Sequence, residues 1–159
     1  MSIMGRRWRR QWPWTSGGEA VAAEPPEADD LLDAGAVDRM GRIDLHYAAG
    51  EGDIGRLREL LRGGSDPNHQ DDQGRTPLHF AAVHAQPDAA RVLLEAGAQV
   101  DVEDSWGNHP LARAVTSTRG ACELIRLLLD AGADPEHANH SGNSPLSTAN
   151  LIANYDIKR

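Results

Sequence analysis

The chain has 159 residues, enough for one domain, and its formal net charge is −8. Aromatic residues make up only 4% of it, so a core must be built mainly from Leu, Ala, Val and Ile. Its one cysteine, Cys122, excludes an internal disulfide and favours a reducing compartment, here the cytoplasm, and no apolar run is long enough to span a membrane.

Residues 1–30 differ in composition from the rest of the chain. The first 14 residues intersperse arginines with tryptophans: Arg6, Arg7, Arg9 and Arg10 with Trp8, Trp12 and Trp14. Arginine binds phosphate and tryptophan stacks on bases or lies at a membrane interface, so contact with nucleic acid or an anionic membrane is one interpretation. A twin-arginine export signal is disfavoured because no apolar segment follows. We favour a disordered basic extension, continued by a flexible acidic linker up to residue 30.

From residue 31 the chain is repetitive, with a period of about 33 residues. Four glycines fall 33, 33 and 35 positions apart, and a leucine follows each of them four positions later: Gly41, Gly74, Gly107 and Gly142, with Leu45, Leu78, Leu111 and Leu146. A Leu-Leu pair followed by a glycine recurs with the same period, at Gly64, Gly97 and Gly132. Two patterns that share one period indicate a repeat architecture.

The second unit shows what the repeated residues do. Thr76 stands where a helix N-cap is needed, and Pro77 follows at the first helical position, where its fixed φ fits. Leu78 begins an apolar face with helical spacing, and a second helix is expected from about Pro87. Gly97 would end that helix in the left-handed conformation that glycine tolerates best. The pattern predicts a helix–turn–helix unit followed by a projecting loop.

The Thr-Pro-Leu-His sequence at residues 76–79, together with the period, resembles the ankyrin repeat. The resemblance implies an all-α fold, a solenoid of about three and a half helix–turn–helix units with projecting loops. We place the repeat domain at residues 31–159, with units near residues 38–70, 71–103 and 104–138 and a partial unit at 139–159.

Two histidines, His46 and His79, occupy the same position in successive units. A metal ligand or a general base is one interpretation of these side chains. We favour the other, in which each imidazole bonds to the backbone of a neighbouring loop and ties adjacent units together. Ala112 and Ser147 stand at this position in the later units, which predicts weaker ties towards the C-terminus.

The third unit departs from the pattern in two places. His109 replaces the capping threonine, although Pro110 is kept, and the stretch between the helices is two residues longer than in the second unit. Insertions in repeat proteins fall in loops, commonly on a working face, so Arg119 in this stretch is a candidate contact residue; the alternative is neutral loop drift. In the fourth unit Pro145 can again open a helix.

The sequence contains no Gly-rich phosphate loop, HExxH or Gly-x-Ser-x-Gly pattern. The loop histidines have neither the spacing nor the cysteine pair of a structural zinc site. We therefore predict a protein that is not an enzyme and that uses neither a cofactor nor a metal.

Proteins of the resembled family typically bind partners through the projecting loops and the concave face of the first helices. Charged, aromatic and polar side chains of these regions are therefore the candidate partner-binding residues: Asp71, Asp72, Phe80, Asp101, Glu103, Asp104, Trp106, Arg113, Arg119, Asn139 and His140. Trp106 is the best hot-spot candidate, because aromatic residues dominate many interfaces. The acidic residues favour a basic partner; the alternative is that loop aspartates only cap turns and maintain solubility.

The leading hypothesis is a monomeric, non-catalytic protein-binding module. The chain looks like small stand-alone bacterial ankyrin proteins, which are often thought to neutralise a toxin made beside them or to regulate a neighbouring enzyme. It also resembles the four-repeat ankyrin kinase inhibitors in size and acidity, and its composition does not decide between the two. A third, less favoured hypothesis is nucleic-acid or membrane binding through residues 6–14. It predicts that deletion of the first 30 residues abolishes binding.

Overall fold

The structure is a computed structural model, which describes residues 36–117 and 122–150. These ranges consist of helices and loops: α1 (Asp44–Glu51), α2 (Ile54–Arg62), α3 (Pro77–Val83), α4 (Pro87–Glu95), α5 (Pro110–Ser117) and α6 (Cys122–Asp130). Residues 145–150 are helical as well, and no strand occurs in the ranges described. The predicted all-α fold is therefore confirmed. The arginine- and tryptophan-rich segment and the linker lie outside the described residues.

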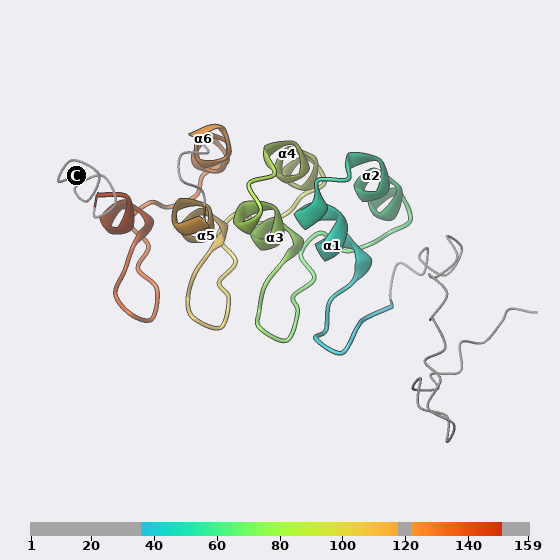
Figure 1. Cartoon of the computed structure of the whole chain (residues 1–159), viewed down its shortest axis with the longest axis horizontal. Helices are drawn as coiled ribbons and strands as arrows, with labels where there is room; N and C mark the ends of the chain where they lie inside the picture. The colour runs from blue at the N-terminus through green and yellow to red at the C-terminus, as the bar shows by residue number, and fades with distance from the viewer. Residues whose placement is uncertain (1–35, 118–121, 151–159) are drawn as a thin grey trace, which may run out of the picture. The chain divides into compact units, whose positions relative to one another are not determined.

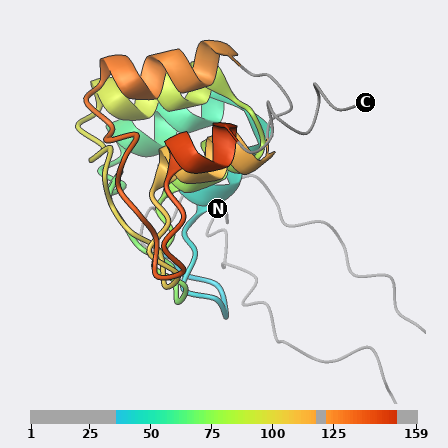
Figure 2. The same ribbon diagram turned by 90° about the vertical axis from the view of Figure 1, so that its left-hand side faces the viewer.

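The helices form two layers. Helix α1 packs on α2, α3 on α4 and α5 on α6, while α3 packs between α1 and α5 in one layer and α4 packs between α2 and α6 in the other. Figure 1 shows the pairs side by side in chain order, with the short helix at residues 145–150 in the layer of α5. The loops before the first helix of each unit project together on one side, as Figure 2 also shows. We call the surface formed by α1, α3, α5 and these projecting loops the loop-side face.

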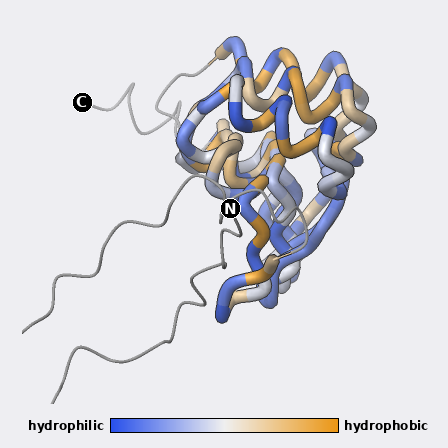
Figure 3. The backbone as a smooth tube through the Cα atoms, turned by 90° about the vertical axis from the view of Figure 1, so that its right-hand side faces the viewer, coloured by the Kyte–Doolittle hydropathy of each residue, from blue (hydrophilic) through white to orange (hydrophobic). Residues whose placement is uncertain are grey.

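The core follows from the repeated leucines and alanines. Residues with no exposed surface come from both helices of each unit: Leu45, Ala48, Ala49, Leu57, Leu78, Ala81, Ala82, Ala89, Ala90, Leu93, Ala114, Leu124 and Leu128. Hydrophobic and hydrophilic stretches alternate along the helices in Figure 3. Each buried leucine contributes roughly 1.5–3 kcal/mol to stability, and the alanines let neighbouring helices approach closely. The core is thus one continuous layer between the two rows of helices.

The predicted helix starts are correct. Thr76 is the N-cap of α3 with extended backbone, and Pro77 is the first residue of that helix. Pro110 opens α5 and Pro145 opens the helix at residues 145–150. In each case proline costs nothing, because the first turn of a helix leaves its N–H groups without intrahelical partners.

Glycine is required at two kinds of position. Gly97 and Gly132 follow α4 and α6 with φ of +92° and +98°, the left-handed conformation that the sequence predicted for Gly97. Gly74 has φ of +72° in a projecting loop, and a Cβ there would lie 3.2 Å from the Cα of Asp104. Gly74 therefore permits both the turn and the close approach of the next loop.

One of the two extra residues of the third unit lengthens a helix. Helix α5 has eight residues where α3 has seven, so Ser117 is the additional helical residue. The candidate contact residue Arg119 lies in the range 118–121, outside the described residues.

Candidate functional site

Each projecting loop is folded around one Asp or Asn side chain, three residues before the repeat glycine. These residues are Asp38, Asp71, Asp104 and Asn139. The Oδ1 atom accepts hydrogen bonds from the backbone N–H groups two and four residues later, at 2.7–3.0 Å in all four loops. Such Asx-type bonds satisfy backbone groups that the loop would otherwise leave unpaired. The loops are therefore built alike and hold their remaining side chains on fixed backbones.

Neighbouring loops are also joined through their backbones. An N–H group of each loop donates to a carbonyl of the loop before it, at 2.9–3.0 Å: Asp72 to Met40, Ser105 to Gln73, and His140 to Trp106. These bonds fix the spacing between loops, so side chains from different units keep a constant relative position.

The histidines His46 and His79 tie the units together. The Nε2–H of His79 donates to the carbonyl of Asn108 at 3.0 Å, and its Nδ1 accepts from the backbone N–H of Thr76 at 3.1 Å. His46 donates in the same way to the carbonyl of Arg75 at 3.0 Å. Burial lowers the pKa of His79 to about 4, so this imidazole is neutral at pH 7. Both histidines have the structural role that the sequence favoured.

Asp71 and Asp104 have internal partners, and their side chains are completely buried. The Oδ2 of Asp71 accepts from Nε and Nη2 of Arg75 at 3.0 and 2.8 Å, with Nε of Arg42 at 3.5 Å. The Oδ2 of Asp104 accepts from Nε of Arg113 at 2.9 Å and from its Nη2. Burial alone would raise the pKa of each carboxyl, but these hydrogen bonds outweigh it and lower the pKa. The interpretation of both residues as partner contacts is corrected: their role is to fold the loops.

The third unit obtains its arginine from a different place. Asn108 stands where the second unit has Arg75, so the loop itself supplies no cation to Asp104. The guanidinium comes instead from Arg113 on α5, at the position that Phe80 occupies on α3. With Arg113 at this position, α5 carries no aromatic ring where α3 has Phe80.

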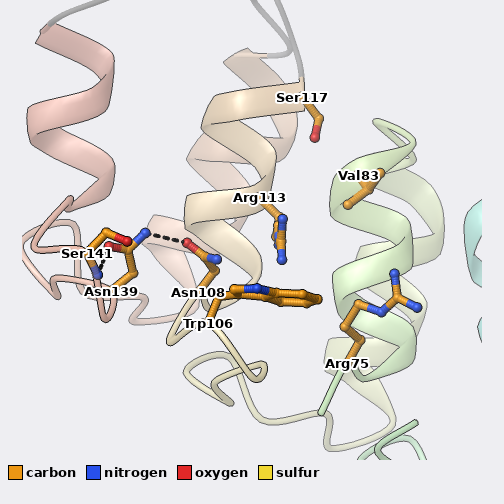
Figure 4. Close-up of a pocket in the computed structure, with 8 residues that line it drawn as sticks. All are labelled: Arg75, Val83, Trp106, Asn108, Arg113, Ser117, Asn139 and Ser141. Atoms are coloured by element: carbon orange, nitrogen blue, oxygen red, sulfur yellow. Dashed lines mark hydrogen bonds between the residues drawn. The ribbon is translucent and has the colours of Figure 1, made fainter. Parts of the chain in front are cut away.

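Trp106 supplies an aromatic ring to the third unit from the loop. Its side chain is exposed, with 49% of the residue surface accessible, and the guanidinium carbon of Arg113 lies 5.3 Å from the ring centroid. The ring borders a pocket of about 470 Å³ lined by Arg75, Val83, Trp106, Asn108, Arg113, Ser117, Asn139 and Ser141. Figure 4 shows Arg113 above the indole and Arg75 beyond its far edge. The pocket brings together three predicted contact residues, Trp106, Arg113 and Asn139.

The family model described as Ankyrin repeats (3 copies) matches residues 45–150. The chain belongs to the ankyrin repeat family. Ankyrin repeats are generally protein–protein interaction modules. Comparison with curated proteins finds no match that would name a particular partner or activity.

Phe80 holds a different place in this ankyrin domain from Trp106. Its ring is half-buried, with the guanidinium carbons of Arg42 and Arg75 at 5.4 and 5.0 Å from its centroid and the ring of His46 at 5.1 Å, edge-on. Cation–π contacts on this ring join the first and second units. Phe80 therefore mainly stabilises the ankyrin stack and leaves a smaller surface for a partner.

The remaining predicted contact residues are exposed on the ankyrin loops but do not line the pocket: Asp72, Asp101, Glu103 and His140. The carboxylate of Glu103 is not unpaired, since its Oε1 lies 2.7 Å from Nε2 of His137. Asp72, Asp101 and Glu103 are thus acidic residues of the projecting loops that a partner can reach.

His109 is a feature that the sequence could not foresee. The residue is 1% exposed, and neither ring nitrogen has a hydrogen-bond partner within the described structure. Its ring contacts that of His137, with 5.3 Å between centroids, and burial lowers its pKa. Its place at the cap position was visible in the sequence, but its missing partners depend on packing. Among the described residues no group of three or more His, Cys, Asp or Glu could hold a metal ion, and no helix is long and apolar enough to cross a membrane.

Proposed function

We propose that this ankyrin chain binds a protein partner on its loop-side face, with Trp106 at the centre of the contact, and that it catalyses no reaction. The observation that carries the proposal is the half-exposed indole of Trp106, held beside a pocket by a loop whose backbone is fixed through Asp104. An aromatic side chain on a rigid backbone loses little conformational entropy on binding, and aromatic residues are enriched among interface hot spots.

The acidic residues of the projecting loops support a partner with basic groups around the contact. Asp72, Asp101 and Glu103 are exposed on these loops, and the chain has a formal net charge of −8. Such a field speeds the association of a basic protein and does so less at high salt. An association rate that does not change between low and high salt would remove this part of the proposal.

The proposed outcome of binding is inhibition or neutralisation of the partner in the cytoplasm by a monomeric chain. The general role of ankyrin repeats in protein–protein interaction supports the binding step, and inhibition is our proposal for what binding does. It is tested by measuring the partner's own activity, once the partner is identified, with and without an excess of the chain. Unchanged activity in the saturated complex would replace inhibition by a role in assembly or localisation.

The proposed contact is tested with two matched truncations, Trp106→Ala and Leu129→Ala. Both side chains are exposed, at 49% and 41%, but Leu129 lies on α6 in the other layer of helices. A partner captured by the full chain from the cells that produce it would be purified and its Kd measured by calorimetry. We expect Trp106→Ala to weaken binding by about 2 kcal/mol, roughly thirtyfold, and Leu129→Ala to weaken it less than threefold.

Equal losses for the two variants, or none for Trp106→Ala, would show that the partner binds elsewhere. Thermal unfolding of both variants controls for misfolding, because an exposed side chain contributes little to stability.

A further inference from the structure

The pocket beside Trp106 has no carboxylate among its lining residues, although the chain as a whole is acidic. Its polar lining consists of two guanidinium groups, two amides and two hydroxyls: Arg75 and Arg113, Asn108 and Asn139, Ser117 and Ser141. All six can donate hydrogen bonds, and the two arginines can only donate. The lining therefore matches a ligand that accepts hydrogen bonds.

The guanidinium groups of the two arginines are partly exposed to the pocket, whereas their carboxylate partners are not. Their carboxylate partners, Asp71 and Asp104, have fully buried side chains, whereas the side chains of Arg75 and Arg113 are 22% and 28% exposed. Each aspartate accepts from Nε and Nη2, so the Nη1 side of each guanidinium points away from its carboxylate. A molecule that enters the pocket meets the cations before it meets the anions behind them.

The rest of the lining is apolar and exposed. Trp106 is 49% and Val83 39% exposed, and the indole extends from the third unit towards the second. The volume of about 470 Å³ is within the range of pockets that enclose small ligands or a few side chains. An occupant with one acidic and one apolar group would satisfy both parts of the lining.

We propose that the pocket takes a carboxylate side chain of the partner together with an apolar neighbour, so that the partner presents an acidic–apolar segment here. This inference rests on the proposed function, because it specifies the group that enters the same site. The carboxylate accepts hydrogen bonds from Arg75 and Arg113 while the apolar neighbour packs on Trp106. A polyanion such as nucleic acid fits less well, because the exposed loop residues Asp72, Asp101 and Glu103 would repel its remaining phosphates.

The probes are three capped peptides that differ only in charge: acetyl-Leu-Glu-Leu-Asp-amide, its isostere with Gln and Asn in place of the acids, and its counterpart with two lysines. Each is titrated into the full ¹⁵N-labelled chain, and the indole N–H signal of Trp106 is assigned by its absence in Trp106→Phe. We expect the acidic peptide to shift that signal with a Kd about fivefold lower than that of the isostere, the upper range for an exposed ion pair. The lysine peptide should bind most weakly.

Exposed Ser141 and Ser117 allow the charge of the pocket to be changed without touching the buried ion pairs. Ser141→Lys should tighten binding of the acidic peptide two- to fivefold and Ser141→Glu should weaken it by a similar factor; the Ser117 pair gives a second reading. Melting curves of the four variants check that each is folded.

Equal affinity for the three peptides, a preference for the lysine peptide, a reversed effect of the serine variants, or no shift of the Trp106 signal would each overturn the acidic-segment proposal. A single-stranded oligonucleotide that shifts the signal more strongly than the acidic peptide would also overturn it, in favour of phosphate. None of these results touches the proposed function, which fails only if Trp106→Ala leaves binding of the protein partner unchanged.

Discussion

The second and third loops solve one structural problem with different residues. Both fold around a buried aspartate, Asp71 or Asp104, that must be neutralised by arginine. In the second loop the arginine is Arg75, four residues further along, and Phe80 stacks against it. In the third loop the arginine is Arg113 on α5, nine residues further along. Because Arg113 stands at the position that Phe80 occupies in the second unit, the first helix of the third unit has no aromatic ring there.

The aromatic rings of the two units differ in their surroundings, one within the helix stack and one beside the pocket. The second unit keeps its aromatic ring between two arginines and a histidine, where it stabilises the stack. The third unit moves its aromatic ring to Trp106 in the loop, where it is half exposed beside a pocket. A repeat thus acquires a distinctive surface where it departs from its neighbours, while the features that repeat hold the solenoid together.

The largest effect is expected from removal of the third buried carboxylate. Asp104→Ala leaves two backbone N–H groups and Arg113 without their acceptor, and we expect the free energy of unfolding to fall by about 3 kcal/mol. Asp104→Asn should cost less, about 2 kcal/mol, because it keeps the two backbone bonds that Asn139 makes in the fourth loop but loses the Oδ2 acceptor of Arg113. Urea unfolding measures both, with exposed Asp72→Ala as the control. Equal losses for Asp104→Ala and Asp104→Asn would contradict the role assigned to Oδ1.

Acid should loosen the ties that both loops receive from the histidines. In the folded chain burial lowers the pKa of His79 to about 4, so between about pH 6.5 and 4 the unfolded state binds more protons. Stability is therefore present above pH 6.5 and lost as the pH falls, by about 2 kcal/mol at pH 5 from His79 alone. His46 and His109, whose pKa values burial also lowers, act in the same direction.

The carboxyls contribute at lower pH. Hydrogen bonds lower the pKa of Asp71 and Asp104, so their stabilisation is lost only as the pH falls below the ordinary aspartate value towards the folded one. Urea titrations at pH 7 and 5 on the wild-type chain and on His79→Ala separate the two effects. If both proteins lost the same stability between these pH values, His79 would not be the neutral tie described.

The two aromatic residues should differ in what their removal changes. Phe80→Ala removes a half-buried ring between the first two units, and we expect a loss of about 2 kcal/mol in the free energy of unfolding. Trp106→Ala removes a half-exposed ring and should cost less than about 1 kcal/mol of stability, although we expect it to weaken partner binding roughly thirtyfold. Unfolding curves and partner affinity are measured on both variants. A larger loss of stability for Trp106→Ala than for Phe80→Ala would contradict the assignment of Phe80 to the helix stack and of Trp106 to the exposed contact surface.

The smallest loss of stability is expected from Arg91→Ala, which serves as the control for Arg113→Ala. Arg91 pairs with Glu123 between α4 and α6 at 3.4 Å, but both side chains are more than half exposed. Arg91→Ala should change the free energy of unfolding by less than about 0.5 kcal/mol, since solvent screens such pairs. Arg113→Ala leaves the buried carboxylate of Asp104 unpaired and should cost several times more. Similar values for the two would mean that the internal ion pair of the third loop is weak.

The repeated features of the fold could be predicted from the sequence because each follows from local chemistry. Thr76 before Pro77 marks a helix start, and Gly97 marks a helix end, whatever surrounds them. The histidine ties were predictable in kind, because a residue that recurs at one position of a repeat has a structural role more often than a catalytic one.

The site was predicted only in part, because burial of a charged residue is decided by residues that are distant in sequence. The sequence places Asp71 and Asp104 among the loop acids that a partner could contact, and the recurrence of Asp or Asn three residues before each repeat glycine is the signal for their buried role. The pairing of Arg113 with Asp104 could not be found by period, since it replaces the repeated arrangement. The exposure of Trp106 could be predicted because it depends on the local loop sequence, whereas its role as a contact residue stays a prediction.

The most direct test of the central claim, that the pocket beside Trp106 is the partner-binding site, is site-specific photo-cross-linking in cells. Benzoylphenylalanine replaces Val83, which lines the pocket and is exposed, and in a matched control it replaces Leu129 on α6. We predict a cross-linked partner from position 83 and none from position 129. Excess wild-type chain should suppress the cross-link, and excess Trp106→Ala chain should not. A partner cross-linked from position 129 alone, or one from position 83 that both competitors suppress equally, would contradict the account.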